Sequence, residues 1–362
     1  MERQVSNERK KIYVAMSGGV DSSVAAALLK KQGFSVVGVF MKPWQPKQSN
    51  FVCMWQKDRE DAMRVAAKLG IPLLTWDFSK EYKREVADYM VREYRTGRTP
   101  NPDVMCNKHI KFGLFLEKAL KEGADLIATG HYIRKLKIKN EKLKVNEYKL
   151  FKAIDKNKDQ TYFLWTLNQK VLSKCIFPIG DYTKPEVRRM AKKFGLPTAD
   201  KKDSQGVCFI GPLDMKNFLQ KYIKPKNGMI YHTNGKMLGT HDGVSYYTIG
   251  QRHGLDIKNG KGPYYVVDKD VKSNVLYVGS KDDLLSQKLK LTGINWINRS
   301  PVDKRHDVSL LDVRIRYRAE LSKAIVKDNG EVIFKKKETA ITSGQSAVFY
   351  RGEELLGGGI IE

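Results

Sequence analysis

Short apolar segments alternate with amphipathic stretches along the first third of the chain, and this alternation constrains the fold more than any other feature. Each apolar segment has the length of one buried strand, and each amphipathic stretch repeats apolar residues at spacings of three and four. Gly33 and Gly70 stand just past two of these stretches, where helix terminators usually lie. Strand and helix in alternation build a parallel sheet with helices on both faces, so we expect a doubly wound α/β domain. The expected strands are 12–16, 35–41, 73–76 and 125–129, and the expected helices follow Asp21 or span about 58–69, 81–94 and 109–121.

The pattern changes after residue 132. Residues 133–158 form a polar, Lys-rich stretch with ten basic and three acidic side chains, which predicts a pair of strands. A helix restarts at Thr183, because Thr183 and Glu186 have the spacing of a capping box and Pro185 fits the first turn. Gly195 marks its expected end.

Beyond about Asp203 the helical period fades and strand-like runs recur. Asn234-Gly235, Asp242-Gly243 and Asn329-Gly330 are sequences typical of hairpin turns. From Lys288 onward, six apolar segments are spaced like the strands of an antiparallel barrel. We therefore expect a parallel doubly wound α/β domain at residues 1–207, a small mixed or β domain at 208–286, and a C-terminal antiparallel β-barrel at 287–362.

The chain is strongly basic, with 66 Lys and Arg against 40 Asp and Glu and a formal net charge of +26. Such an excess is usually tolerated for a polyanionic partner, with nucleic acid the first candidate and an anionic membrane surface the second. A general enrichment of lysine would give the same total. The clustering of basic residues at 133–158 favours an RNA-facing insertion.

The four cysteines and the first residues bear on the compartment. The stretch 1–11 is charged and lacks the apolar segment of a secretory signal, so we expect a cytoplasmic, reducing environment with reduced thiols. No CxxC pair and no nearby His at ligand spacing accompany the cysteines, so neither a zinc site nor a disulfide framework is expected. No apolar run reaches the length of a membrane span.

The strongest chemical signal is SGGVDSS, Ser17 to Ser23, between the first expected strand and the first helix. Its two glycines let backbone N–H groups approach an anion, and the helix behind them adds its positive end. Ser22 and Ser23 supply hydroxyl donors, while Asp21 can cap the helix or lie near a magnesium ion. The stretch is neither a GxxxxGK[ST] loop nor a GxGxxG motif, and a plain turn with a Ser or Asp cap is the alternative. We interpret it as a phosphate cradle.

SGGVDSS resembles the loop of the ATP-pyrophosphatase superfamily, whose members adenylate a carbonyl oxygen and release pyrophosphate. Further blocks appear in the order found in the tRNA-specific 2-thiouridylases, and together they span nearly the whole chain. These blocks are GRTPNPDVMCN (97–107), ATGHY (128–132), KDQTYFL (158–164), KDSQGVCFIG (202–211), YTIGQRHGL (247–255) and SGQSAVFY with a GGGII tail (343–361).

The resemblance implies thiolation of a tRNA wobble uridine. The carbon-2 carbonyl is a poor electrophile, so ATP converts its oxygen to a leaving group, and a cysteine persulfide then delivers sulfur. A second cysteine can release that sulfur by forming a disulfide with the first. By the family pattern Cys208 is the persulfide carrier and Cys106 its partner. Both have polar neighbours and are expected in loops, whereas Cys53 and Cys175 have apolar neighbours.

The same resemblance assigns the remaining site residues. Asp103, three positions before Cys106, can reach the same pocket and shuttle a proton, although an Asp after Pro102 is often only a turn residue. The expected ATP contacts are Ala15, Met16, Ser17, Gly18, Gly19, Val20, Asp21, Ser22, Met41 and Gly130, with Mg2+ as the accompanying ion and no other metal site. The expected tRNA contacts are Asn101, Pro102, Asp103, Lys158, Asp159, Gln160, Arg316 and Tyr317.

Other functions stay open on the sequence. Loop-sharing ligases such as lysidine or argininosuccinate synthetases need no cysteine pair, and an RNA-binding protein that only senses the nucleotide would not turn ATP over. After 40–44 the stretch QPKQSNFVCMW lacks the acidic character that relatives often show there, which leaves Cys53 without an assigned role. The expected partners are tRNA and a cysteine desulfurase or sulfur-relay protein. We expect a monomer and no membrane association.

Overall fold

The computed structural model describes residues 9–45, 54–140, 145–203, 214–298 and 308–362. Its residues form two compact units. The first consists of Met1–Lys83, Asp103–Gly211 and Glu353–Leu355, and the second of Arg84–Pro102, Pro212–Gly352 and Leu356–Glu362. Each unit therefore contains more than one stretch of the chain.

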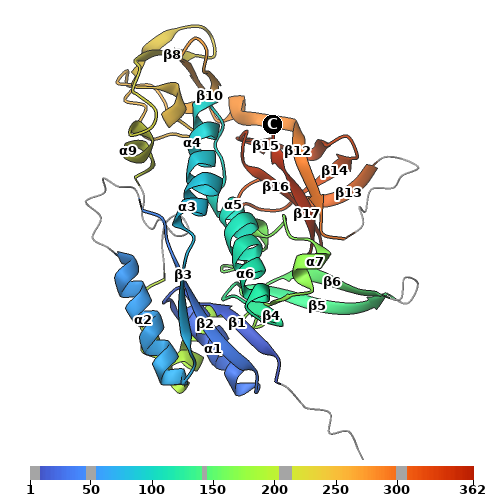
Figure 1. Ribbon diagram of the computed structural model, residues 1–362. Coiled ribbons are helices and arrows are strands. Elements are labelled where there is room, and N and C mark those ends of the chain that lie inside the picture. The colour runs from blue at the N-terminus through green and yellow to red at the C-terminus, as the bar shows by residue number, and fades with distance from the viewer. Residues whose placement is uncertain (1–8, 46–53, 141–144, 204–213, 299–307) are drawn as a thin grey trace, which may run out of the picture. The chain divides into compact units, whose positions relative to one another are not determined.

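A five-stranded parallel sheet lies at the centre of the first unit (Figure 1), so the expected α/β domain is confirmed. The strand order is β3-β2-β1-β4-β7. The order reverses at β1, which places a crevice at the carboxyl ends of β1 and β4, where ligands of such sheets bind. The strands are β1 (Lys11–Ala15), β2 (Ser35–Lys42), β3 (Leu73–Asp77), β4 (Leu126–Ala128) and β7 (Cys175–Ile176).

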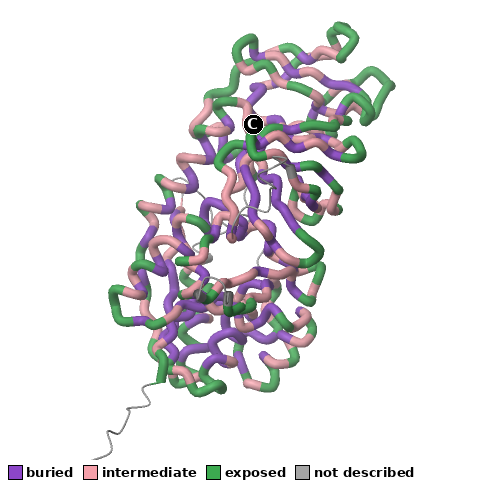
Figure 2. Tube along the Cα trace, turned by 90° about the vertical axis from the view of Figure 1, so that its right-hand side faces the viewer, coloured by how far each residue is buried: buried purple, intermediate pink, exposed green. Residues whose placement is uncertain are grey.

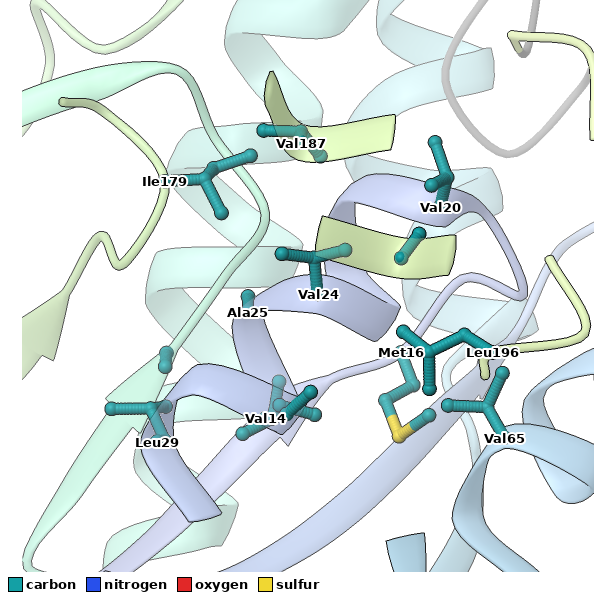
Figure 3. Packing of buried hydrophobic residues seen from close by; sticks show 14 of the residues in the cluster. Val14, Met16, Val20, Val24, Ala25, Leu29, Val65, Ile179, Val187 and Leu196 are labelled. Carbon is teal, nitrogen blue, oxygen red and sulfur yellow. The ribbon is translucent and has the colours of Figure 1, made fainter. Parts of the chain in front are cut away.

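Alternate residues of β1 face opposite sides of this sheet. Val14 lies on the side where three helices bury their apolar residues, among them Val24 of α1 and Val65 of α2 (Figure 3). Tyr13 points to the other side, and its ring lies 5.8 Å from that of Trp76, which in turn packs 5.7 Å from Phe115 of α6. The helices are α1 (Val20–Lys31), α2 (Met54–Leu69), α6 (Phe115–Lys121) and α8 (Lys184–Lys193).

Two longer helical stretches complete the connections. The stretch from Ser79 to Arg95 consists of α3 (Ser79–Tyr82), the π-helical η1 (Lys83–Ala87) and α4 (Asp88–Arg95). The stretch from Pro102 to Lys121 consists of α5 (Pro102–Met105), the π-helical η2 (Cys106–Leu114) and α6. The helix expected from about residue 109 thus begins at Pro102. Proline fits the first helical position because the N–H it lacks would have no intrahelical partner there.

The Lys-rich stretch forms an antiparallel hairpin, as predicted. Its strands are β5 (Ile133–Asn140) and β6 (Val145–Lys152). The outer edge of β6 pairs with Glu354 and Leu355, at the start of the last strand. Short elements, η3 (Thr161–Phe163) and α7 (Gln169–Leu172), then lead to α8, whose capping box at Thr183 and Glu186 forms as expected.

A four-stranded sheet of order β10-β11-β8-β9 belongs to the second unit. Its hairpin at Asn234-Gly235 is confirmed, but the hairpin expected at Asp242-Gly243 is wrong, because Gly243 leads into the 3-10 helix η4 (Val244–Tyr246). The Asn274 side chain accepts a hydrogen bond from the backbone N–H of Val244 and holds that turn. The other elements are α9 (Met215–Gln220), β8 (Gly228–His232), β9 (Met237–His241), β10 (Tyr265–Asp270), β11 (Val275–Gly279) and η5 (Asp282–Leu284).

Six antiparallel strands close into the expected barrel, in the order β12-β15-β14-β13-β16-β17 with β12 paired to β17. Gly330, with φ +86°, makes the turn between β14 and β15 that Asn329-Gly330 predicts. The interior of the barrel is apolar, with Phe334 and Phe349 almost fully buried. The strands are β12 (Leu285–Trp296), β13 (Val308–Arg314), β14 (Ser322–Lys327), β15 (Glu331–Thr339), β16 (Ser346–Arg351) and β17 (Glu354–Ile361).

Burial follows these elements. Exposed residues, green in Figure 2, gather at the turns, while buried residues line the strands and the inner faces of helices. Within the described ranges, no helix is long and apolar enough to cross a membrane.

Candidate active site

The SGGVDSS segment forms the turn between β1 and α1, at the crevice where the strand order reverses. The Ser22 hydroxyl accepts a hydrogen bond from the N–H of Ser17 at 3.2 Å and donates one to the carbonyl of Gly19 at 3.2 Å. Gly19 is the N-cap residue, and no side chain in the described structure caps the helix. The first N–H groups of α1 therefore point out of the helix, as they do in anion sites.

Two glycines allow the close contacts around this loop. Gly18 has φ +75°, and a Cβ there would lie 2.1 Å from the carbonyl oxygen of Asp58. Gly130 follows β4, and a Cβ there would lie 2.6 Å from the backbone nitrogen of Ser22. The loops after β1 and β4 therefore touch at backbone distance. Ala15 to Ser22 and Gly130, all predicted ATP contacts, come together here. Met41, at the end of β2, is 5% exposed and pairs in the sheet with Trp76.

Asp21 contacts groups far away in the sequence instead of capping its own helix. Its carboxylate accepts hydrogen bonds from the Tyr132 hydroxyl at 2.7 Å and from the Lys184 ammonium at 2.7 and 2.8 Å. The Lys184 side chain is only 10% exposed, and its ammonium also lies 2.9 Å from Asp203. One buried cation thus joins the phosphate loop to Asp203. Neither Lys184 nor Asp203 was identified from the sequence.

Asp203 is the acceptor for three cations. Besides Lys184, it pairs with Lys158 at 2.5 Å and with Arg188 at 2.7 Å. Burial alone would raise the pKa of Asp203, but hydrogen bonds from Lys158 and Lys184 outweigh it and lower that pKa to about 2. Burial and the neighbouring Asp21 carboxylate raise the pKa of Tyr132, so its hydroxyl stays protonated as a donor.

A second lysine secures the other side of the loop. The Lys201 ammonium contacts the Gly18 carbonyl at 3.1 Å and the carboxylates of Asp58 and Asp61 at 2.7 and 2.6 Å. Burial lowers the pKa of Lys201, but the two carboxylates more than compensate and raise it. The ammonium therefore remains charged and holds the loop to the start of α2.

Cys106 lies at the start of η2, so the expectation that it lies in a loop is wrong; its side chain is fully buried. Asp103 precedes it by one helical turn, in α5. The same helical stretch carries Phe112, whose ring lies 5.7 Å from that of His131, the residue after Gly130. The helix of Cys106 thus packs beside the loop that touches Ser22. Burial lowers the pKa of His131 well below its ordinary value, so this imidazole is neutral.

Cys175 is the other cysteine among the residues that the structure describes. Cys175, in β7, is 1% exposed, and its thiol donates to the Val171 carbonyl. Burial raises the pKa of the Cys175 thiol to about 12, which makes it a poor nucleophile at neutral pH. Cys53 and Cys208 lie outside the described residues. Within those residues, no group of three or more His, Cys, Asp or Glu could hold a metal ion.

The segment before Asn101 is anchored by residues of two other motifs, YTIGQRHGL and SGQSAVFY. Thr99 donates its N–H to the carbonyl of Ser343 at 2.8 Å and its hydroxyl to Thr248 at 3.2 Å. The Gln345 amide donates to the carbonyls of Thr99 and Pro100 at 2.8 and 3.1 Å. All of these contacts lie within the second unit, where Asn101 and Pro102 also belong.

The residues predicted to contact tRNA have different surroundings. Lys158 is half-buried against Asp203, and the Gln160 side chain accepts a hydrogen bond from the N–H of Tyr132. The Asp159 carboxylate is 4% exposed and accepts hydrogen bonds from Ala153 and Thr161, so it holds the local turn. In the second unit, the exposed Arg316 follows β13 and donates to the Ala340 carbonyl at 2.8 Å. Tyr317 packs against the guanidinium of Arg318.

A parallel sheet with an open phosphate loop at its switch point, joined to a small β domain and a closed barrel, defines a nucleotide-binding enzyme of the ATP-pyrophosphatase loop class. Family models match almost the whole chain. They are described as tRNA methyl transferase HUP domain over residues 10–212, tRNA methyl transferase PRC-barrel domain over 216–280, and aminomethyltransferase beta-barrel domain over 286–361.

Curated relatives identify the family more narrowly than these domain models do. The chain is 48% identical to the tRNA-specific 2-thiouridylase MnmA 2 of Geobacillus kaustophilus, over 97% of this chain and 94% of that protein. It is also 48% identical to the tRNA-specific 2-thiouridylase MnmA of Bacillus subtilis, over 100% of this chain and 97% of that protein. The chain belongs to the tRNA-specific 2-thiouridylases, a family of enzymes.

Proposed function

We propose that this enzyme replaces the carbon-2 oxygen of a tRNA wobble uridine with sulfur, using ATP for activation and Cys208 and Cys106 for sulfur transfer. The observation that carries the proposal is the open phosphate loop at the sheet's switch point, in a chain 48% identical to curated 2-thiouridylases. We propose the same division of the chain into residues 1–207, 208–286 and 287–362.

The phosphate loop fits a nucleotide. Gly18 and Gly130 keep Cβ atoms out of a tight backbone junction, and the exposed Ser17 lies beside the N-terminus of α1. We propose that ATP contacts residues 15–22 and Gly130, and that Met41 contacts its adenine base. When bound, ATP supplies an adenylyl group that makes the carbon-2 oxygen a leaving group. The N–H groups of α1 and the Ser hydroxyls would stabilise the phosphate charge.

Magnesium enters this proposal as the ion that accompanies ATP. The Asp21 carboxylate is engaged by Lys184 and Tyr132, which leaves it poorly suited to bind a metal ion by itself. Mg2+ commonly keeps most of its waters and binds through one or two carboxylates and substrate phosphates. We therefore propose that Mg2+ is held mainly by ATP.

The sulfur step uses two thiols and balances without an added oxidant. Cys208 carries a persulfide, loaded by a desulfurase or relay protein. The Cys106 thiolate attacks the inner sulfur, a disulfide forms between Cys106 and Cys208, and hydrosulfide leaves. Hydrosulfide attacks carbon 2, the bond from carbon 2 to oxygen breaks, and AMP departs with that oxygen. A cellular dithiol then reduces the disulfide.

The contacts of Asp203 support a role for Cys208 at this loop. Asp203 pairs with Lys184, which pairs with Asp21. Cys208 follows Asp203 by five positions, which limits the distance between their Cα atoms to about 18 Å at full extension. Asp103, one turn before Cys106, is the proposed proton carrier and, with Asn101 and Pro102, the contact to the base.

The tRNA contacts extend over both units in this proposal. Lys158, Asp159 and Gln160 follow the basic hairpin, and Arg316 and Tyr317 follow β13 of the barrel. A cation beside an aromatic ring suits a splayed base. Because Asp159 is buried in its turn, we propose that it shapes the segment rather than touching RNA. We place the reaction in the cytoplasm, on a monomer.

The test is nucleoside mass spectrometry of unmodified tRNA after incubation with the enzyme, ATP, Mg2+ and a sulfur donor. We expect 2-thiouridine from the wild type and from Cys175→Ala, whose thiol is inert, but none from Cys106→Ser or Cys208→Ser. A nitrogen-transferring ligase would survive both serine substitutions, and a methyltransferase would yield methylated uridine without ATP. Either outcome, or a product without pyrophosphate release, would reject the proposal.

A further inference from the structure

The segment that leads into the predicted base contacts has few backbone N–H groups that could fix its position. In Thr99-Pro100-Asn101-Pro102, two of four residues are prolines and lack a backbone N–H. Such a segment cannot be fixed by donating its own N–H groups at those positions, so its carbonyl oxygens must accept bonds from elsewhere. Thr99 and Pro100 are both buried, where an unsatisfied carbonyl is costly.

Gln345 meets this requirement. Its amide nitrogen donates to the Thr99 carbonyl at 2.8 Å and to the Pro100 carbonyl at 3.1 Å. A primary amide offers two donors on one atom, which matches two neighbouring carbonyls. Glutamate at this position would present acceptors to acceptors, and alanine would leave both carbonyls without these bonds.

The backbone that carries Gln345 is itself tightly held. Gly344 donates to the Ile361 carbonyl at 2.8 Å, and the Gln345 carbonyl accepts from the N–H of Ile361 at 2.8 Å. Gly344 has φ +90°, and a Cβ there would lie 2.9 Å from backbone atoms of Thr99. Only glycine permits this approach. The amide is thus presented from a turn held by these backbone bonds, directly before β16, whose residues 346–350 are buried.

We infer that Gln345 is a positioning residue for the reaction: it fixes the Thr99–Pro100 carbonyls so that Asn101, Pro102 and Asp103 are held ready for the target uridine. The inference rests on the proposed function, since it uses the proposed base contacts. It gives the barrel a part in the chemical step in addition to tRNA binding. A displacement of about 1 Å at reacting groups can cost about 100-fold in rate.

The experiment compares Gln345→Ala and Gln345→Glu with Gln287→Ala. Gln287 is a matched control because its amide also donates to a barrel carbonyl, that of Phe334 at 3.2 Å, far from Thr99 in sequence. The measurements are kcat and KM for tRNA in thiolation, tRNA affinity by filter binding, and affinity for a non-hydrolysable ATP analogue. Thermal melting of each variant shows whether it is folded at the assay temperature.

We expect kcat to fall about 10- to 100-fold in Gln345→Ala and further in Gln345→Glu, because the carboxylate repels the two carbonyls. Affinities for tRNA and the ATP analogue should stay within about twofold, and Gln287→Ala should resemble the wild type. If Gln345→Ala is destabilised, Thr248→Val, which removes the hydroxyl that accepts from Thr99, should give a smaller loss in kcat.

A kcat for folded Gln345→Ala equal to that of Gln287→Ala would overturn the inference, as would a loss confined to tRNA affinity. The wild type separates this failure from failure of the proposed function. If the wild type makes no 2-thiouridine, the function is wrong; if it does, and the Gln345 variants match it, only the positioning role is wrong.

Discussion

The buried ammonium of Lys184 gives the most demanding stability prediction. It contacts both Asp21 and Asp203, and Lys184→Met would remove the cation while keeping an apolar side chain of similar length. Breaking a buried ion pair costs about 3–5 kcal/mol, because the partner charge is left uncompensated. Each carboxylate is 31% exposed and keeps other donors, so we expect the lower end, about 3 kcal/mol.

The assay is hydrogen exchange by mass spectrometry on the whole chain, which reports local opening where two-state unfolding is not assured. A loss of about 3 kcal/mol should speed exchange in peptides from α8 about 150-fold, while β16 peptides in the other unit stay unchanged. Lys184→Arg keeps the positive charge, so its loss of local stability should be much smaller.

The matched control is Lys192→Met on the same helix. The Lys192 side chain is 63% exposed and pairs with an exposed Asp200. Exposed pairs contribute about 0–1 kcal/mol, so exchange in this variant should change less than about fivefold. If α8 exchanges alike in Lys184→Met and Lys192→Met, the bridging cation is not what holds this region.

Three further predictions follow from the site. The depressed pKa of Asp203, about 2, means that its stabilisation is present above pH 4 and is lost as the pH falls through 2. The free energies of unfolding of wild type and Asp203→Asn, obtained from melting curves, should differ by on the order of 1 kcal/mol at pH 7 and converge near pH 2. A difference that stays constant over this pH range would contradict the prediction. Gly18→Ala should weaken ATP-analogue binding about tenfold or more by calorimetry, because its Cβ meets Asp58; Gly33→Ala, also at positive φ but in open space, should only cost about 1 kcal/mol in stability. Chelating Mg2+ with EDTA should stop tRNA-dependent pyrophosphate release, and unaffected release would exclude the proposed magnesium role.

Local patterns were sufficient for most of the fold. The strand–helix alternation, the capping box at Thr183 and the turn at Asn329-Gly330 each follow from short-range chemistry, and each is present. The start of the Cys106 helix was missed for an equally local reason. Residues 106–114 are π-helical, so their apolar side chains do not repeat at 3.6 residues, and polar neighbours of Cys106 suggested a loop. Pro102 at a first helical position was the available signal.

The ion network could not be found from periodicity, because Asp21, Lys184 and Asp203 lie far apart in sequence. One anomaly did mark it. A lysine in the first turn of a helix opposes the helix dipole, and Lys184 occupies the first position of α8. Local rules are broken mostly where a site requires it, so this position was the place to look. The anchoring of Thr99 by Gln345 needs three-dimensional contacts, since no sequence rule pairs a barrel glutamine with a distant Thr-Pro.

The pairing of β6 with Glu354 and Leu355 has a consequence for biosynthesis. Arg134 and Lys149 of the hairpin find their carboxylate partners in Glu353 and Glu354, which the ribosome adds long after the hairpin itself. Until then the part of the β6 edge that Glu354 and Leu355 cover is unpaired, and Arg134 and Lys149 lack these carboxylates. A nascent chain would therefore expose a basic strand edge that can bind cellular RNA or chaperones. An amino-terminal fragment expressed alone would keep this edge exposed permanently.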